Sequence, residues 1–184
     1  METLEQTKQN VADLHWLAAL VTGCREKATE VTFQAIPPDT GANAFFSSWM
    51  HAWSRRIVIA KALAAVSQDL ARSSRQIAVS RVEKSERSPD SWTLDRHTTK
   101  SDLERALLPI DVFPRAAVLL LIFERVPLND AAVLLDSDPD LVRKALAAGV
   151  RELTINLARM QGWTPTASST DCEDYHVRAT KIPS

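Results

Sequence analysis

The most informative segment of the sequence is residues 127–153, which read PLNDAAVLLDSDPDLVRKALAAGVREL. Its apolar residues recur every three or four positions on both sides of a polar run, which is the spacing of two amphipathic helices. In that run Asp138 can cap a helix, Pro139 suits the first helical position and Asp140 favours the positive end of the helix dipole. We therefore expect a short helix over residues 128–135, a short turn, and a longer helix that ends near residue 160.

Two helices joined by a short turn, the second longer and basic, are typical of a helix-turn-helix unit. Small and aliphatic residues are placed to be buried between the two helices: Ala132, Leu135, Val142 and Leu146. The start of the second helix would then face outward, where it can enter a DNA major groove. Arg143, Lys144 and Arg151 are its basic residues, and a merely solvated helix face is the alternative interpretation.

The segment before this unit predicts two further helices. Residues 103–107 form a short helix that Pro109 ends, and Pro114 opens a helix over residues 115–125. The second of these is apolar nearly all round, so we expect it to be buried. Its apolar run, residues 116–123, is too short to cross a bilayer.

The first third of the chain predicts three more helices, over residues 11–20, 26–36 and 45–71. The prolines at positions 37 and 38 end the second one. The third carries an apolar stripe that includes Trp49 and Trp53, which we expect in the core rather than on a base-stacking surface. Arg55, Arg56 and Lys61 lie off that stripe.

These elements predict an all-α protein of two small helical domains. The domains span residues 8–71 and 103–160, and the helix-turn-helix belongs to the second. Residues 72–102 are rich in serine and basic side chains, which predicts a linker. A continuation of the preceding helix into its first part is the alternative. Residues 161–184 are polar and predict a disordered tail.

Charge is segregated along the chain. Residues 1–49 carry three Lys and Arg against six Asp and Glu, whereas residues 50–87 carry eight against three. This distribution predicts a basic surface in the middle of the chain, suited to a polyanion. The alternative for Arg55, Arg56 and Lys61 is an ordinary polar helix face.

The sequence lacks the signatures of catalysis and secretion. It contains no P-loop, no G-x-G-x-x-G and no G-x-S-x-G, and its four histidines lack metal-ligand spacing. Cys24 and Cys172 are isolated and read as reduced thiols, and the polar start is no signal peptide. We therefore expect a cytoplasmic protein without membrane insertion, catalytic residues, metal or cofactor.

The second half of the chain resembles the C-terminal domain of sigma factors of the extracytoplasmic-function type, in the sigma-70 family. The family's leucine-proline step and following arginine correspond to Leu108-Pro109 and Arg115. Its acidic-aliphatic-alanine step corresponds to Asp130-Ala131-Ala132, and its valine-plus-base step on the recognition helix to Val142-Arg143.

The first half resembles the family's N-terminal domain, through Trp49, Trp53, Arg55, Arg56 and the aliphatic run at residues 57–59. The resemblance covers residues 11–71 and 103–158, in the family's order. It implies core RNA polymerase and promoter DNA as partners, with an anti-sigma factor as a further candidate. The implied DNA-binding residues are Arg55, Arg56, Lys61, Arg115, Asp140, Arg143, Lys144 and Arg151. The implied polymerase-binding residues are Glu30, Val31 and Gln34.

The chain departs from the family pattern at several positions. Residues 28–34 keep one acidic residue where the family has a pair, and the turn glycine and aliphatic residue expected at Asp136 and Ser137 are missing. The usually basic stretch of the recognition helix reads ALAAGV at residues 145–150. These departures motivate an alternative, a sigma-like interaction module that binds a protein such as an anti-sigma factor. A helix-turn-helix repressor is weaker, because it leaves the Trp-rich N-terminal block unexplained.

Overall fold

The computed structural model describes residues 4–35, 44–79 and 98–162, which fold entirely into helices and turns without a strand. The N-terminal half forms α1 (Leu4–Thr22), α2 (Arg25–Ala35), α3 (Ala44–Ala65) and α4 (Ser67–Val79). The C-terminal half forms α5 (Lys100–Leu107), α6 (Val112–Val118), the π-helical turn η1 (Leu119–Phe123), α7 (Leu128–Leu134) and α8 (Pro139–Met160). The predicted all-α class is thus confirmed for this part of the chain. Of the helices described, none is long and apolar enough to cross a membrane.

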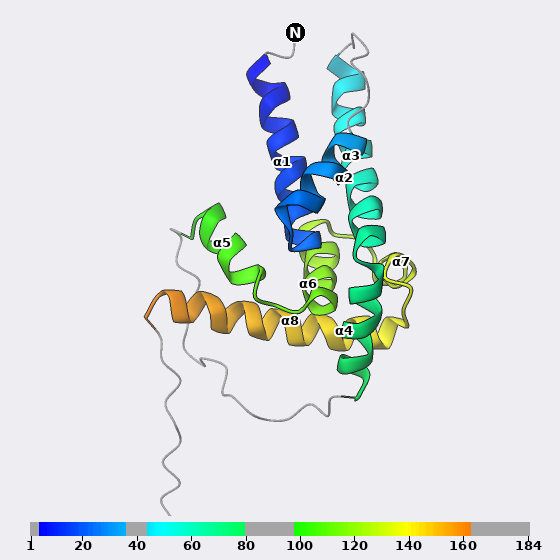
Figure 1. Cartoon of the computed structure of the whole chain (residues 1–184), viewed down its shortest axis with the longest axis vertical. Helices are drawn as coiled ribbons and strands as arrows, with labels where there is room; N and C mark the ends of the chain where they lie inside the picture. Colours follow the sequence, from blue (N-terminus) through cyan, green and yellow to red (C-terminus); the bar gives the residue numbers. More distant parts are fainter. Residues whose placement is uncertain (1–3, 36–43, 80–97, 163–184) are drawn as a thin grey trace, which may run out of the picture.

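Helices α1, α2 and α3 pack against one another at one end of the molecule (Figure 1). The apolar face of α1, which includes Leu14, Leu17 and Leu20, is buried against the other two. Helix α1 ends at Gly23, whose φ of 68° lies in the left-handed region where glycine meets no steric penalty. The chain can therefore reverse directly into α2.

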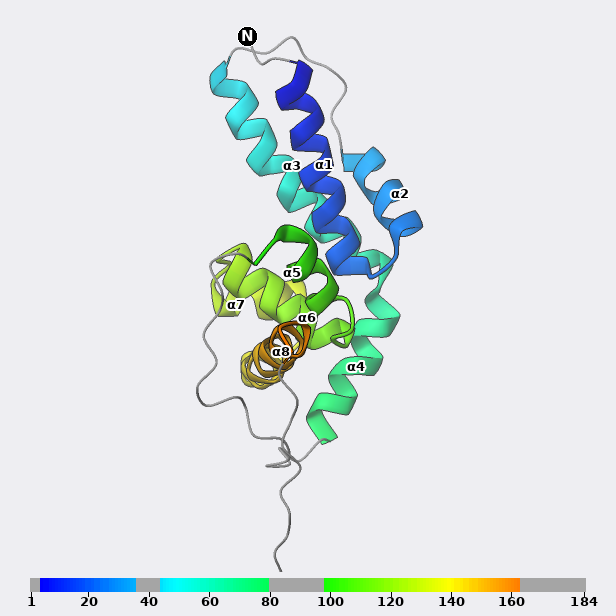
Figure 2. The ribbon, with the colours of Figure 1, turned by 90° about the vertical axis from the view of Figure 1, so that its left-hand side faces the viewer.

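The prediction of one continuous helix over residues 45–71 is wrong, because α3 ends at Ala65 and α4 begins at Ser67. At Val66 the backbone N–H donates to the carbonyl oxygen of Leu63, 3.2 Å away, three residues back instead of the four of an α-helix. Leu63, Val66 and Leu70 are all buried. Helix α4 therefore leaves the N-terminal helices and runs beside α6 and α8 (Figure 2).

Helix α6 is the buried centre of the C-terminal half. Every residue of Val112–Val118 is buried, and α8 crosses α6 while α4 and η1 also pack against it. The predicted helix is confirmed, but it begins three residues before Arg115 because the side chain of Asp111 accepts the N–H of Val112 at 2.9 Å. Pro114 lies inside the first turn, where it costs no hydrogen bond.

The end of this helix is π-helical. The N–H of Glu124 donates to the carbonyl oxygen of Leu119, five residues back, at 2.9 Å. Arg125 follows with a φ of 53°, a left-handed conformation that is uncommon for a residue other than glycine. The wider turn sets the direction in which Glu124 projects.

The buried residues of both predicted domains belong to one hydrophobic cluster, from Leu14 to Ala145. The packing therefore does not confirm a division into two domains. The predicted linker boundaries fall in helices, because residues 72–79 belong to α4 and α5 begins at Lys100. Residues 80–97 of that linker and residues 163–184 of the predicted tail lie outside the described residues.

Candidate nucleic-acid interface

Helices α7 and α8 are joined by the four residues from Leu135 to Asp138. The N–H of Ser137 donates to the carbonyl oxygen of Ala132 at 3.0 Å, and that of Asp136 to Val133 at 3.2 Å. This pair of bonds is a Schellman motif, which requires a left-handed residue after the helix. Asp136 adopts it with a φ of 46°. The turn of the motif is thus formed although its preferred glycine is absent.

The first turn of α8 presents polar side chains to solvent. The Asp138 side chain accepts the N–H of Asp140 at 2.8 Å, and Pro139 occupies the first turn, as predicted. Asp140 and Arg143 are exposed and form an ion pair with each other. The guanidinium of Arg143 is therefore available, but the neighbouring carboxylate offsets its charge.

Lys144 and Arg151 lie seven residues apart, which places them on the same side of α8. Lys144 is half-buried and Arg151 is exposed. Burial raises the pKa of the neighbouring Glu152, the charge of Arg151 opposes this rise, and the charge of Asp111 adds to it. The basic face of α8 is thus short, and Arg151 has an acidic residue as its next neighbour in the chain.

Two of the small residues at positions 145–149 have a structural explanation. Ala145 and Gly149 are buried, and a Cβ on Gly149 would stand 2.7 Å from the carbonyl oxygen of Pro114 in α6. No side chain fits there, because α8 crosses α6 at this point. At these two positions the missing basic residues reflect helix packing.

Arg115 was predicted to bind DNA, but it lies in the core with 6% of its surface exposed. Its Nη1 donates to the carbonyl oxygens of Leu108 and Ile110 at 2.9 and 2.8 Å, and its Nε is buried without a hydrogen-bond partner. Burial lowers the pKa of its guanidinium, and the charge of Asp111 acts against that shift. Arg115 joins the end of α5 to α6 and is not accessible to DNA in this structure.

The three basic residues predicted on α3 have different environments. Arg55 is half-buried and pairs with Glu124, to which its Nε donates at 3.2 Å. Lys61 donates to the Oε1 of Gln34 at 3.2 Å. Arg56 is exposed and makes no ion pair with a described residue. Of these three residues, Arg56 alone makes no ion pair or hydrogen bond with another described residue.

The predicted polymerase-binding residues also have different environments, because two of them are exposed and one is buried. Glu30 and Gln34 are exposed on α2, and the side-chain amide of Gln34 donates to Glu30 at 3.3 Å. Together with Lys61 they form one hydrogen-bonded row across α2 and α3. Val31 is buried at 5% exposure. It packs in the core and cannot serve as a surface contact in this structure.

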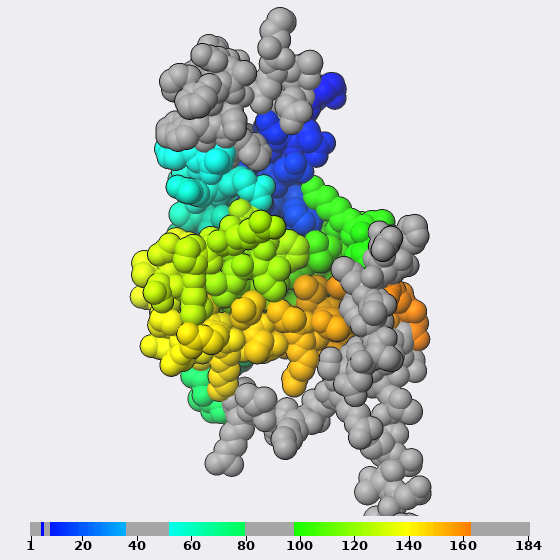
Figure 3. Space-filling view, turned by 180° about the vertical axis from the view of Figure 1, so that it is seen from behind, coloured from blue at the N-terminus to red at the C-terminus, as the bar shows by residue number. Residues whose placement is uncertain are grey.

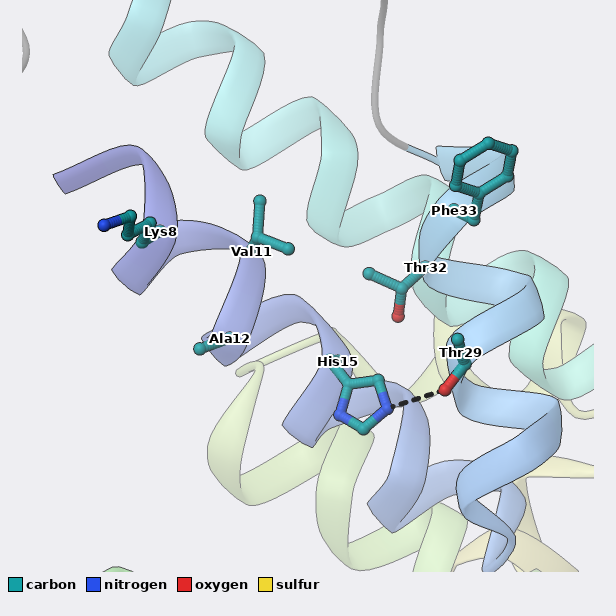
Figure 4. Close-up of a pocket in the computed structure, with 7 residues that line it drawn as sticks. All are labelled: Lys8, Val11, Ala12, His15, Thr29, Thr32 and Phe33. Atoms are coloured by element: carbon teal, nitrogen blue, oxygen red, sulfur yellow. Dashed lines mark hydrogen bonds between the residues drawn. The ribbon is translucent and has the colours of Figure 1, made fainter. Parts of the chain in front are cut away.

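An apolar groove between α1 and α2 was not expected from the sequence (Figure 4). It has a volume of about 570 Å³ and is lined by Val11, His15 and Thr32 among others. His15 is hydrogen-bonded to the hydroxyl of Thr29 at 3.1 Å. The ring of Phe33 is 82% exposed at the rim. Phe33 lies off the buried stripe of α2, which consists of Ala28, Val31, Thr32 and Ala35, so the helical period was a signal of this exposure that the sequence reasoning missed.

A second groove separates α3 from the η1–α7 segment and has a volume of about 700 Å³. Arg55, Arg56 and Arg125 line it. Val133 and Leu134 line it too and are exposed at 81% and 40%. Nearby on α3, Trp53 is 43% exposed, so its predicted core position is wrong. The side chain of Trp49 lies outside the described residues.

Comparison of the chain with family models, with curated proteins and with solved structures found no match.

Proposed function

We propose that this protein is an RNA polymerase sigma factor of the extracytoplasmic-function type. The observation that carries the proposal is the geometry of α7 and α8. A four-residue turn joins them, Val142 and Ala145 are buried, and Asp140 and Arg143 face solvent in the first turn of α8. A helix of this kind, exposed at its start, is what enters a major groove in a helix-turn-helix protein.

The N-terminal half supports the same proposal through its surface. Helix α2 exposes Glu30 and Gln34 near the apolar groove beside Phe33, a combination that suits contact with a large protein such as core polymerase. Helix α3 exposes Arg56 and part of Trp53 on another side. Arginine and an aromatic ring together can hold a single-stranded nucleic acid. The proposed contacts thus lie on separate surfaces.

A second candidate is a sigma-like interaction module that binds a protein partner. The observation that favours it is the engagement of the basic side chains within the chain itself. Arg55 pairs with Glu124, Arg143 pairs with Asp140, and Arg115 is buried. Since duplex DNA binding depends on neutralising phosphates, these contacts reduce the charge available for it.

One experiment separates the two candidates. The purified protein is mixed with bacterial core RNA polymerase, and the complex is isolated by size-exclusion chromatography at low and moderate salt. A sigma factor co-elutes with core enzyme, and Phe33→Ser weakens the complex while the solvent-facing change Ala64→Ser does not. If the folded protein does not co-elute with core enzyme at either salt concentration, the interaction module is the candidate that remains.

A further inference from the structure

The groove between α3 and the η1–α7 segment contains cationic side chains that have no partner among the described residues. Arg55 and Glu124 both line it and pair with each other, so their charges cancel. Arg56 comes from α3 and Arg125 from the turn after η1, and neither forms an ion pair or hydrogen bond with another described residue. The other acidic residue of the lining is Asp130. Two positive charges therefore stand against one negative charge, which favours an anionic ligand.

The rest of the lining is aliphatic. Ala52 and Ile59 come from α3, and Val133 and Leu134 come from α7. The side chains of Val133 and Leu134 are 81% and 40% exposed, so a ligand in the groove would remove apolar surface from water. Among the described residues that line the groove, none is aromatic, and a nucleic-acid base therefore finds no ring to stack on there. The lining suits an aliphatic chain.

Both walls of the groove belong to one folded body, so the groove exists without a ligand. Ile59 of α3 and Leu135, at the end of α7, are buried in the same hydrophobic cluster. The ion pair between Arg55 and Glu124 joins α3 to the residue after η1. Figure 3 shows the face of the molecule on which α3 borders the η1–α7 segment. The volume of about 700 Å³ lies within the range of roughly 300–1,000 Å³ for small-molecule sites, which are usually preformed.

We propose that this groove binds a free aliphatic carboxylate, which is an acyl chain with one negatively charged head group. The carboxylate accepts hydrogen bonds from the guanidinium groups of Arg56 and Arg125, and the chain lies against Val133 and Leu134. Charge-assisted hydrogen bonds of this kind are stronger than those between neutral groups. The site goes beyond the proposed function, since binding there requires neither DNA nor polymerase. A bound carboxylate would occupy Arg56, the residue of α3 that the proposed function assigns to nucleic acid.

The apolar groove between α1 and α2 lacks this combination of groups. Its lining includes Lys8, whose ammonium is paired with the carboxylate of Glu5 at 3.1 Å. His15, which also lines it, is hydrogen-bonded to a threonine of α2. The cationic groups of Arg56 and Arg125 are not engaged in this way. We therefore assign the carboxylate to the groove beside α3.

Isothermal titration calorimetry of the full chain with hexanoate, octanoate and decanoate at low salt tests the site. We expect one site whose affinity rises about threefold for each added methylene, because the burial of each methylene is favourable. Two matched ligands separate the head group from the chain. Butyrate, which has the charge but little chain, and octanol, which has the chain without the charge, should each bind at least about tenfold more weakly than octanoate.

Matched variants locate the bound ligand in the groove. Arg56→Gln and Arg125→Gln should each weaken octanoate binding about tenfold, whereas Arg75→Gln, at an exposed arginine of α4, should not. Val133→Ser should weaken binding about threefold, whereas Val79→Ser, at a position of α4 that is 84% exposed, should leave it unchanged. All five side chains are exposed, so each variant should melt near the midpoint of the parent protein.

The absence of binding by all three carboxylates would overturn the proposal, and so would equal affinity for octanoate and octanol, because the arginines would then play no part. Octanoate binding that neither Arg56→Gln nor Arg125→Gln weakens would also overturn it, since the ligand would then lie elsewhere. The proposed sigma function fails on a different observation, the absence of a complex with core polymerase. A protein that binds octanoate as expected but forms no such complex keeps this site and loses the proposed function.

Discussion

Gly149 of α8 faces the carbonyl oxygen of Pro114 in α6 so closely that a Cβ would stand 2.7 Å from that oxygen and equally close to a methyl of Val118. The backbones of the two helices thus meet at the point where α8 crosses α6. Glycine is otherwise unfavourable inside a helix. Its presence here follows from the crossing of α8 over α6.

Gly149→Ala should lower stability, although helix propensity alone predicts a gain of about 1 kcal/mol. The added methyl meets a backbone oxygen that cannot move without shifting α6, and overpacking of this kind costs about 1–3 kcal/mol. Thermal denaturation of Gly149→Ala should therefore show a lower midpoint. Ala147→Gly, at an exposed position of the same helix, is the control and should lose about 1 kcal/mol. A raised midpoint for Gly149→Ala would disprove the close approach.

Asp136→Gly should raise stability by about 0.5 kcal/mol. Relief of the left-handed backbone at φ 46° outweighs the greater freedom of glycine in the unfolded chain. Asp136→Asn keeps a side chain that tolerates this conformation, and it serves as the charge control with little change expected. Urea denaturation measures both. Equal stability of the glycine and asparagine variants would show that the turn carries no strain.

Arg115→Lys should destabilise the protein by about 1–3 kcal/mol, because an ammonium cannot reach the carbonyl oxygens of Leu108 and Ile110 in the same geometry. The loss belongs to folding rather than to DNA contact, since Arg115 is buried. DNA affinity, measured well below the melting midpoint, should match that of the parent. If Arg115→Lys lowered DNA affinity but left stability unchanged, Arg115 would contact DNA, as the sequence predicts, and this account would be wrong.

Glu152→Gln should stabilise the protein at neutral pH but not in acid. Burial raises the folded-state pKa of Glu152, so its charged form costs stability above that pKa. The cost disappears as pH falls to the unfolded value of about 4.3. The difference in melting midpoint between Glu152→Gln and the parent should therefore shrink from pH 7 toward pH 4. Glu30→Gln, at an exposed position, controls for the general loss of a charge, and a difference constant with pH would contradict this account.

Local chemistry in the sequence was sufficient to predict the helices and many of their ends. Asp138 and Pro139 begin α8 as expected, and Gly23 ends α1. These signals work because caps and breakers act over a few residues. The π-helical turn η1 has no such local signal, and neither does the break at Val66, where no proline or glycine stands.

The candidate site was predictable only in part, because exposure depends on contacts distant in sequence. Asp140, Arg143 and Arg56 lie on the surface as the pattern predicts. Arg115 does not, because the carbonyl oxygens after α5 accept its hydrogen bonds in the core. Arg55 meets a partner 69 positions away, a pairing that helical periodicity cannot reveal.

The proposed sigma function is tested most directly by run-off transcription with core RNA polymerase on a library of genomic DNA fragments. We predict new transcripts with defined start sites when the protein is added. The double variant Arg143→Ala with Arg151→Ala should abolish them while it still binds core enzyme, because the exposed face of α8 would no longer hold the promoter. The absence of any new transcript from the folded parent protein would contradict the proposed function and leave the interaction module in its place.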